Sequence, residues 1–274
     1  MSSFNQLVCL SGLPRAGSTL LSAILSQNPL IHSEGNSAVC QLMWDMEQSL
    51  INNCGEQINA NNRQTTVNDL MSSIPHIYYK NNDKNEKIIV DKCRSWTLSE
   101  NITLLQKYVD KNIKIIILER PLLEVVNSLV KMYNKNNKII DIERLLDDNS
   151  EPIIRSMDGI INAKKNNQHN NFLFITYEEL ITDTNTTLKK IYDFCNWTYF
   201  EHDLKNIVPK YRENDTIYNL NGLHDVHTEI TKQDYNIILP LNIIHQCLLI
   251  QENFNLKINW TIYVNAFKNN WICK

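Results

Sequence analysis

Residues 12–19 of this chain read Gly-Leu-Pro-Arg-Ala-Gly-Ser-Thr, and they decide its fold. The apolar run 7–10 precedes this stretch, and a helical pattern follows it from Ser18. A strand, a glycine-bearing turn and a helix in this order are typical of a phosphate-binding loop. The glycines let successive backbone N–H groups turn toward an anion, and the helix N-terminus attracts negative charge. The stretch therefore predicts an anion site, and the alternative is an ordinary strand–turn–helix with incidental glycines.

One departure from the Walker A pattern indicates the kind of donor. In nucleotide kinases, a lysine directly precedes the conserved Ser or Thr of this motif. This chain has Ser18 at the lysine position, and its positively charged side chain is Arg15, three residues earlier. The Walker lysine neutralises the β- and γ-phosphates of a magnesium nucleotide. A donor that has no γ-phosphate does not need this lysine, so the pattern favours such a donor.

Apolar runs and helical patterns alternate along the chain. Strands are predicted at residues 7–10, 30–35, 88–90, 114–118 and 172–175. Helices are predicted at residues 18–27, 38–79 with breaks that include a loop near 59–63, 99–111, 122–133, 143–166, 178–195 and from about 237. This alternation predicts an α/β, P-loop-type three-layer fold with a central parallel sheet flanked by helices. We expect a single domain over residues 1–274, less regular from about residue 206.

Composition narrows the class of protein. With 274 residues, 43% of them hydrophobic, and a net charge of −3, the chain is expected to fold and to have no general attraction for nucleic acids or membranes. The seven dispersed cysteines contain no CxxC pair, which indicates reduced thiols and gives little support for a metal site. We expect no signal peptide and no membrane span, and therefore a cytoplasmic protein.

Polar side chains follow the ends of several predicted strands. Lys92, Arg120 and Tyr177 each lie just after such an end, as does the loop that contains Arg15. Ligands of open α/β sheets bind at the carboxyl ends of the strands, so we expect these side chains to converge.

Arg120 and Ser128 form a second informative pair. The arginine ends a buried strand, and the serine lies eight residues further on, inside the predicted helix 122–133. A guanidinium fork and a hydroxyl together make a phosphate clamp. The alternative is an arginine paired with Glu119 or Glu124, beside a serine that is merely small.

Together these motifs resemble the PAPS-dependent sulfotransferases, in which PAPS is 3′-phosphoadenosine 5′-phosphosulfate. Residues 13–20 resemble the family's 5′-phosphosulfate loop, and residues 118–128 resemble its 3′-phosphate site. Residues 177–194 form a third block, and residues 223–226 form a weaker fourth one. The stretch Pro-Leu-Ile-His-Ser-Glu-Gly at residues 29–35 is most similar to the tyrosylprotein sulfotransferase-like branch.

The resemblance implies a function and roles for individual residues. The chain would transfer the sulfuryl group of PAPS in line to a hydroxyl acceptor and release PAP, without a metal. Glu34 would be the catalytic base, while Arg15 and Lys92 would stabilise charge on the transferring group, and Arg120 with Ser128 would hold the 3′-phosphate. The implied cofactor-binding residues are Pro14, Arg15, Ala16, Gly17, Ser18, Thr19, Leu20, Arg120, Ser128, Tyr177 and Val226.

The expected partner is a hydroxyl-bearing acceptor, either a peptide tyrosine or a small molecule. A second copy of the chain, giving a homodimer, is a further open expectation, whereas nucleic acids and membranes are not expected partners. The fourth block departs from the tyrosylprotein branch, because Thr228 stands where that branch carries a lysine. This leaves the contribution of residues 224–228 open.

Three alternatives remain open from the sequence. His32 is a rival base, because other sulfotransferase branches use histidine, and on an extended segment it faces the same side as Glu34. The alternative to a catalytic role is that His32 is a buried, hydrogen-bonded histidine. A small P-loop kinase that uses ATP and Mg²⁺ is a different enzyme class, and a catalytically inactive nucleotide-binding module is a non-enzymatic one.

Overall fold

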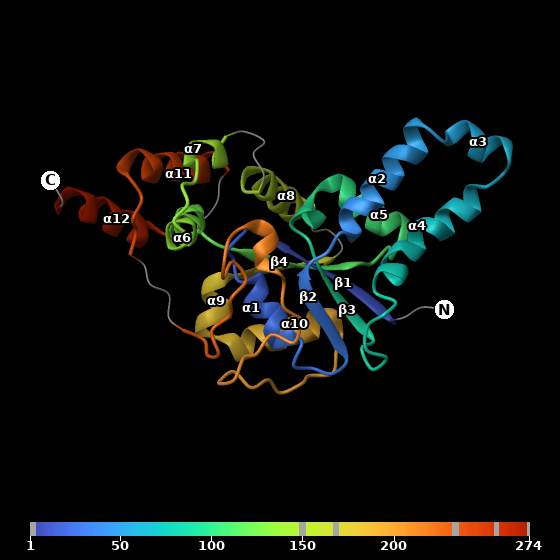
Figure 1. Ribbon diagram of the computed structural model, residues 1–274, viewed down its shortest axis with the longest axis horizontal. Coiled ribbons are helices and arrows are strands. Elements are labelled where there is room, and N and C mark those ends of the chain that lie inside the picture. The colour runs from blue at the N-terminus through green and yellow to red at the C-terminus, as the bar shows by residue number, and fades with distance from the viewer. Residues whose placement is uncertain (1–3, 148–151, 167–169, 232–235, 255–257, 273–274) are drawn as a thin grey trace.

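The strands of this chain are short, nearly continuous apolar runs, as expected for parallel strands that are covered on both faces. The computed structural model describes residues 4–147, 152–166, 170–231, 236–254 and 258–272 (Figure 1). Its sheet has five parallel strands in the order β2-β3-β1-β4-β5. The strands are β1 (Gln6–Gly12), β2 (Ile31–Asn36), β3 (Ile88–Lys92), β4 (Lys114–Glu119) and β5 (Phe172–Thr176). The α/β fold and the five predicted strands are confirmed, with ends that differ by one or two residues.

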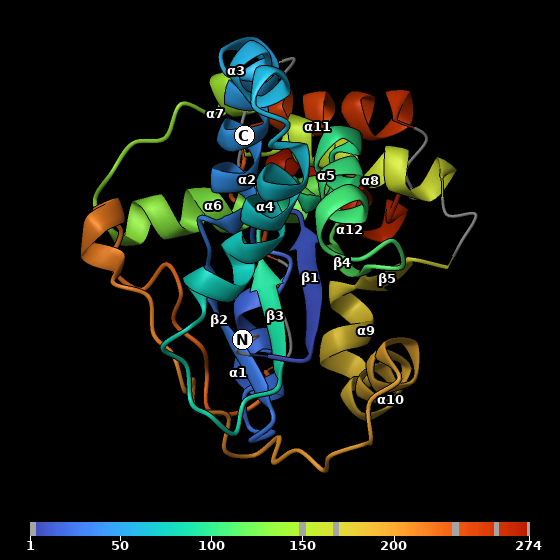
Figure 2. The same ribbon diagram turned by 90° about the vertical axis from the view of Figure 1, so that its right-hand side faces the viewer.

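Helices cover both faces of this sheet. Figure 1 shows α5 and α8 on one side of the strands and α1, α9 and α10 on the other, and Figure 2 shows the same layers after a quarter turn. The helices are α1 (Ser18–Leu25), α2 (Val39–Asn52), α3 (Gly55–Ala60), α4 (Gln64–Tyr78), α5 (Ser99–Tyr108), α6 (Leu122–Lys135), α7 (Ile142–Leu145), α8 (Ile154–Lys165), α9 (Tyr177–Thr182), α10 (Thr184–Cys195), α11 (Leu241–Asn253) and α12 (Trp260–Ile272), with 3₁₀ turns η1 (Arg94–Thr97) and η2 (Asp215–Tyr218). Within the described residues, none of these helices is both long and apolar enough to cross a membrane.

Three helix predictions needed correction. The predicted helix 178–195 is two helices, because Asp183 leaves the helical region at φ −136° and ψ 55°. The predicted helix 143–166 is divided into α7 and α8, and part of the intervening stretch lies outside the described residues. The helical stretch predicted from about residue 237 contains two helices, α11 and α12. Its first helix, α11, begins at Leu241, because Pro240 precedes it and disfavours helical backbone in the residue before it.

The position of β1 determines where the functional residues meet. β1 lies between β3 and β4, so that Leu10 is aligned with Lys92 and Gly12 with Leu118. The carboxyl ends of these three strands therefore lie side by side, and the loops that leave them share one edge of the sheet. Beyond residue 195, the chain crosses this edge again as a long segment that contains η2 (Figure 1).

Candidate functional site

The loop after β1 has the backbone shape that its glycines predict. Gly12 has φ +140° and passes so close to β4 that a Cβ there would clash with the carbonyl oxygen of Leu118. Gly17 has φ +94° and caps α1, and a Cβ on it would lie 2.9 Å from the ring of Tyr177. Arg15 between them is also left-handed, at φ +61°. The loop therefore curls tightly in front of the α1 N-terminus, as an anion cradle requires.

Two guanidinium groups approach each other at this loop. Arg15 donates from Nε to Ser128 Oγ at 3.2 Å and from Nη1 to the carbonyl oxygen of Leu223 at 2.6 Å. Arg120 donates from Nη1 to the backbone oxygen of Arg15 at 2.5 Å. Burial and the nearby Arg120 charge lower the pKa of Arg15 from its ordinary value. Two like charges held together are stabilised by an anion between them, so their proximity favours a phosphate or sulfuryl ligand.

The predicted Arg120–Ser128 pair lies beside this loop, together with the alternative ion pair between Arg120 and Glu124. Arg120 Nε is 3.2 Å from Glu124 Oε2, and its guanidinium carbon lies 4.3 Å from the centre of the Tyr177 ring. Ser128 is one turn further along α6 and holds Arg15 instead. A 3′-phosphate that binds here would therefore compete with Glu124 for one nitrogen of Arg120.

A cleft of about 550 Å³ opens along this edge of the sheet. Every predicted nucleotide-binding residue except Ala16 lines it, and so does Lys92. Ala16 is fully buried, and its N–H donates to the carbonyl oxygen of Leu13 at 3.3 Å, so this amide closes the turn. The predicted contact of the Ala16 N–H with the 5′-phosphate therefore has to compete with this backbone hydrogen bond.

A second cavity, of about 280 Å³, adjoins the first. Glu34 lines this smaller cavity but not the cleft, whereas Lys92 lines both. The other residues that the two cavities share are Thr19, His224, Asp225 and Val226. A donor in the cleft and an acceptor in the cavity would therefore meet beside Lys92, with a carboxylate on the acceptor side.

The two candidate bases differ in their access to this cavity. The Glu34 side chain is one-third exposed, whereas His32 is buried and lines neither of the two cavities. His32 Nε2 lies 3.3 Å from Glu34 Oε2. Glu34 thus stands between His32 and the space that an acceptor would occupy.

Lys92 is held by a residue that the sequence did not suggest. Its Nζ donates to Glu213 Oε1 at 3.0 Å, and burial lowers its pKa although the Glu213 charge acts in the opposite direction. Glu213 reaches this position across Gly35, where a Cβ would clash with the Glu213 side chain. Nothing in the polar segment around Glu213 indicated this role, because the contact depends on how the loop is folded back.

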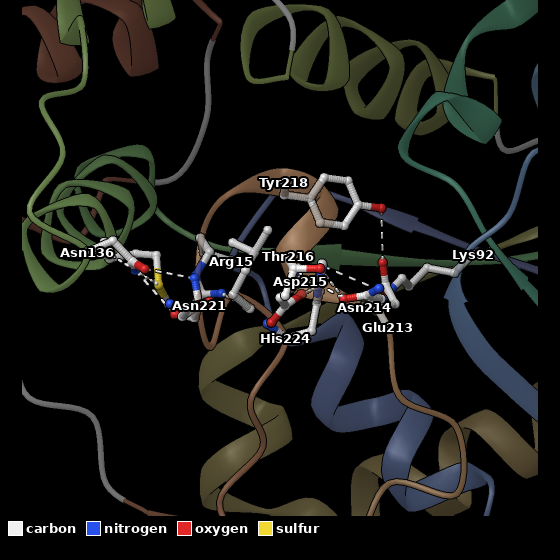
Figure 3. A network of polar contacts seen from close by, with 12 residues as sticks. Arg15, Lys92, Asn136, Glu213, Asn214, Asp215, Thr216, Tyr218, Asn221 and His224 are labelled. Atoms are coloured by element: carbon white, nitrogen blue, oxygen red, sulfur yellow. Dashed lines mark hydrogen bonds and ion pairs between the residues drawn. The ribbon is translucent and has the colours of Figure 1, made fainter.

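His224 and Asp215 complete the polar network, which Figure 3 shows together with Lys92 and Glu213. His224 Nδ1 lies 2.6 Å from Asp215 Oδ1, and His224 Nε2 lies 3.4 Å from Glu213 Oε1. Burial raises the pKa of Asp215, but hydrogen bonds from the His224 backbone and ring outweigh it and hold the pKa below its ordinary value. The fourth sequence block contains His224, and its weak match was the one signal for this part of the site. Within the part of the chain that the structure describes, no group of three or more His, Cys, Asp or Glu side chains is arranged to hold a metal ion.

The central strand of this α/β sheet leads into a glycine-bearing loop with two arginines beside it. The chain belongs to the sulfotransferase family, because the sequence model of that family matches residues 8–201. No curated protein matches the chain significantly.

Solved structures share this fold. The sulfotransferase domain from the curacin biosynthetic pathway has 17% sequence identity and a TM-score of 0.58, with 93% of this chain and 99% of that chain covered. The sulfotransferase domain of the Synechococcus PCC 7002 olefin synthase has 20% identity and a TM-score of 0.52, with 94% and 97% covered. A sulfotransferase from Alicyclobacillus acidocaldarius has 9% identity and a TM-score of 0.52, with 93% and 97% covered.

Proposed function

We propose that this protein transfers the sulfuryl group of PAPS to a hydroxyl acceptor and releases PAP. The observation that carries the proposal is the junction of the two cavities at Lys92. On one side, the cleft holds Arg15 and Arg120, and on the other the cavity holds Glu34. This arrangement separates a site rich in cations from a site that contains a carboxylate, as a transfer from an anionic donor to a hydroxyl requires.

The residues of the cleft fit the two anionic ends of PAPS. The backbone and hydroxyls at the start of α1, in Ser18 and Thr19, would hold the 5′-phosphosulfate, because a helix N-terminus presents free N–H groups there. Arg120 and Ser128 would hold the 3′-phosphate, and Tyr177, which already stacks on the Arg120 guanidinium, would contact the nucleotide. PAPS binding would exchange the contacts that Arg120 makes with Glu124 for contacts with a phosphate.

Sulfuryl transfer resembles phosphoryl transfer, because the protein has to position the two reactants and stabilise the charge that develops. Glu34 would take the proton as the acceptor oxygen forms its bond to sulfur. The bond from sulfur to the 5′-phosphate oxygen breaks, and its electron pair stays on the leaving phosphate. Lys92 and Arg15 would stabilise the charge that develops on that oxygen.

A direct test uses ³⁵S-labelled PAPS, the purified protein and an extract that contains candidate acceptors. We expect the label to appear in a sulfate ester of the acceptor. We also expect PAP to raise the Tm of the protein in a thermal-shift measurement without Mg²⁺. A peptide tyrosine, as in the tyrosylprotein-like branch, and a small molecule are distinguished by the mass of the labelled product. Turnover of Mg·ATP would favour a P-loop kinase, and PAP binding without transfer would favour an inactive nucleotide-binding module.

Three further statements from the sequence stay predictions. They are the single domain over residues 1–274, the homodimer and the cytoplasmic location. Light scattering on the purified protein tests the second, and limited proteolysis tests the first.

A further inference from the structure

Three side chains form a line that ends in the smaller cavity. The alternation of β2 places His32 and Glu34 on the same side of the strand, and Glu86, in the turn before β3, lies behind the imidazole. Glu86 Oε2 is 2.9 Å from His32 Nδ1, and His32 Nε2 is 3.3 Å from Glu34 Oε2. We propose that His32 is a positioning residue for Glu34 and receives the proton that Glu34 takes from the acceptor. This inference rests on the proposed function.

Glu86 anchors the line as a carboxylate. Its side chain is fully buried, and it is 2.7 Å from Lys210 Nζ and accepts a short hydrogen bond from the Tyr211 hydroxyl. Burial raises the pKa of Glu86, but the hydrogen bonds from Lys210, Tyr211 and His32 outweigh it and hold that pKa below its ordinary value. Because Lys210 balances the Glu86 charge, His32 does not have to be an imidazolium for the carboxylate to be compensated.

This anchor selects one form of the neutral imidazole. A carboxylate accepts hydrogen bonds and donates none, so neutral His32 donates its Nδ1–H to Glu86. Its Nε2 then carries a lone pair that faces Glu34 Oε2, and this buried nitrogen has no hydrogen bond of good geometry among the described residues. Two acceptors that face each other form a hydrogen bond when one proton enters between them. The Glu34–His32 pair is therefore built to hold one additional proton.

The ring of His32 is fixed in this orientation by two aromatic neighbours. The Tyr211 ring lies 4.3 Å from it, centre to centre, and the Tyr79 ring meets it edge-on at 5.4 Å. The Tyr79 hydroxyl is itself bound to Asp91 at 2.7 Å. The packing therefore keeps Nε2 directed at Glu34, without a hydrogen bond of good geometry to any described residue.

The proton has a defined path in this arrangement. As the acceptor oxygen bonds to sulfur and the bond to the leaving phosphate breaks, Glu34 takes the acceptor proton. Glu34 then passes it to the lone pair on His32 Nε2 and becomes a carboxylate again. The imidazolium formed in this way lies between Glu86, whose charge Lys210 balances, and the carboxylate of Glu34.

A spectroscopic test does not depend on turnover. In protein labelled with ¹⁵N-histidine, we expect His32 to be the neutral Nδ1–H tautomer in the ligand-free state, with its signal assigned by its loss in His32→Gln. Glu86→Gln removes the charge that selects this tautomer and should shift His32 toward the Nε2–H form, bonded to Glu34. A resting imidazolium, or a tautomer unchanged in Glu86→Gln, would overturn the inference.

A kinetic test separates positioning from folding. We expect His32→Gln to lower kcat about tenfold. This loss is smaller than the roughly 10²–10⁴-fold loss expected when a general base is removed. The KM for PAPS and the Kd of PAP should not change. The matched control is His202→Gln, at another buried histidine, which contacts the Tyr192 hydroxyl at 2.9 Å and should leave kcat unchanged.

The outcomes distinguish this inference from the function on which it rests. Full kcat in His32→Gln beside an inactive Glu34→Gln would overturn the inference alone. A wild-type protein that binds PAP but transfers the sulfuryl group of PAPS to no hydroxyl would overturn the proposed function.

Discussion

Lys92 and Glu213 form an ion pair of 3.0 Å at the point where the two cavities meet, although they are 121 residues apart in the chain. Both side chains are nearly buried, with exposed fractions of 5% and 12%. Lys92 is one of the two side chains, with Arg15, that our proposal places at the transferring group, and the Glu213 carboxylate compensates its charge. A donor anion and Glu213 would therefore compete for the same ammonium group.

This competition predicts opposite effects of Glu213→Gln with and without ligand. The free variant should lose about 5 °C or more in Tm, because it leaves a buried lysine without its counter-charge. PAP should then raise the Tm of the variant by more than it raises that of the wild type, since the ligand restores an anion to Lys92. Differential scanning fluorimetry measures both shifts, and Glu56→Gln, at an exposed position of α3, is the control. Equal PAP shifts in variant and wild type would contradict the competition.

Arg120→Ala should weaken binding of PAP by about 10- to 100-fold, because a hydrogen bond to a charged group contributes about 1.5–3 kcal/mol. Ser128→Ala should have a smaller effect in the same direction. Binding of AMP, which lacks the 3′-phosphate, should change much less in both variants. Titration calorimetry with the two nucleotides makes the comparison, and equal losses for PAP and AMP would remove the 3′-phosphate from this site.

Glu34→Gln should lower turnover about 10²-fold or more and leave PAP affinity and folding close to normal. The amide keeps the size of the side chain and can donate to His32 Nε2, but it cannot accept the acceptor proton. Transfer of ³⁵S from PAPS measures turnover, and calorimetry with PAP is the internal control. If Glu34→Gln keeps most of the activity while His32→Ala abolishes it, His32 is the base.

His202 predicts a specific pH dependence of stability. Burial lowers its pKa to about 4, against an ordinary value near 6.5, so the folded state keeps the imidazole neutral where the unfolded chain binds a proton. The contribution of neutral His202 to the free energy of unfolding is therefore complete above about pH 6.5, and it is lost as the pH falls toward 4. Urea unfolding between pH 7 and 4 should show a shallower decline for His202→Gln, whatever the variant's stability at pH 7. Parallel declines would show that another group is responsible.

Local patterns in the sequence were sufficient to predict the sheet and the backbone shape of the loop after β1. Apolar runs such as Ile115–Leu118 become fully buried strands, and the glycines at residues 12 and 17 adopt the positive φ angles that the loop needs. Because the strands are parallel and adjacent, their carboxyl ends bring Lys92 and Arg120 to one cleft, as predicted from the sequence.

The segment that contains η2 could not be placed in the same way. Glu213, Asp215 and His224 lie in a segment without periodicity, and their positions depend on contacts across the fold, such as the one between the Leu223 carbonyl and Arg15. Glu86 is a similar case, because its partners Lys210 and Tyr211 follow it by more than 120 residues. Such residues become visible when the tertiary contacts are known, since no local signal marks them.

The left-handed backbone of Arg15 has a consequence for how tightly a donor can be held. A non-glycine residue at φ +61° is disfavoured by about 1 kcal/mol, and a contact within the protein, from Arg120 to the Arg15 carbonyl, holds the loop in this shape. The entropy of shaping the cradle is therefore lost during folding and not during association. The anion meets a preorganised receptor, and more of the interaction energy is retained as affinity.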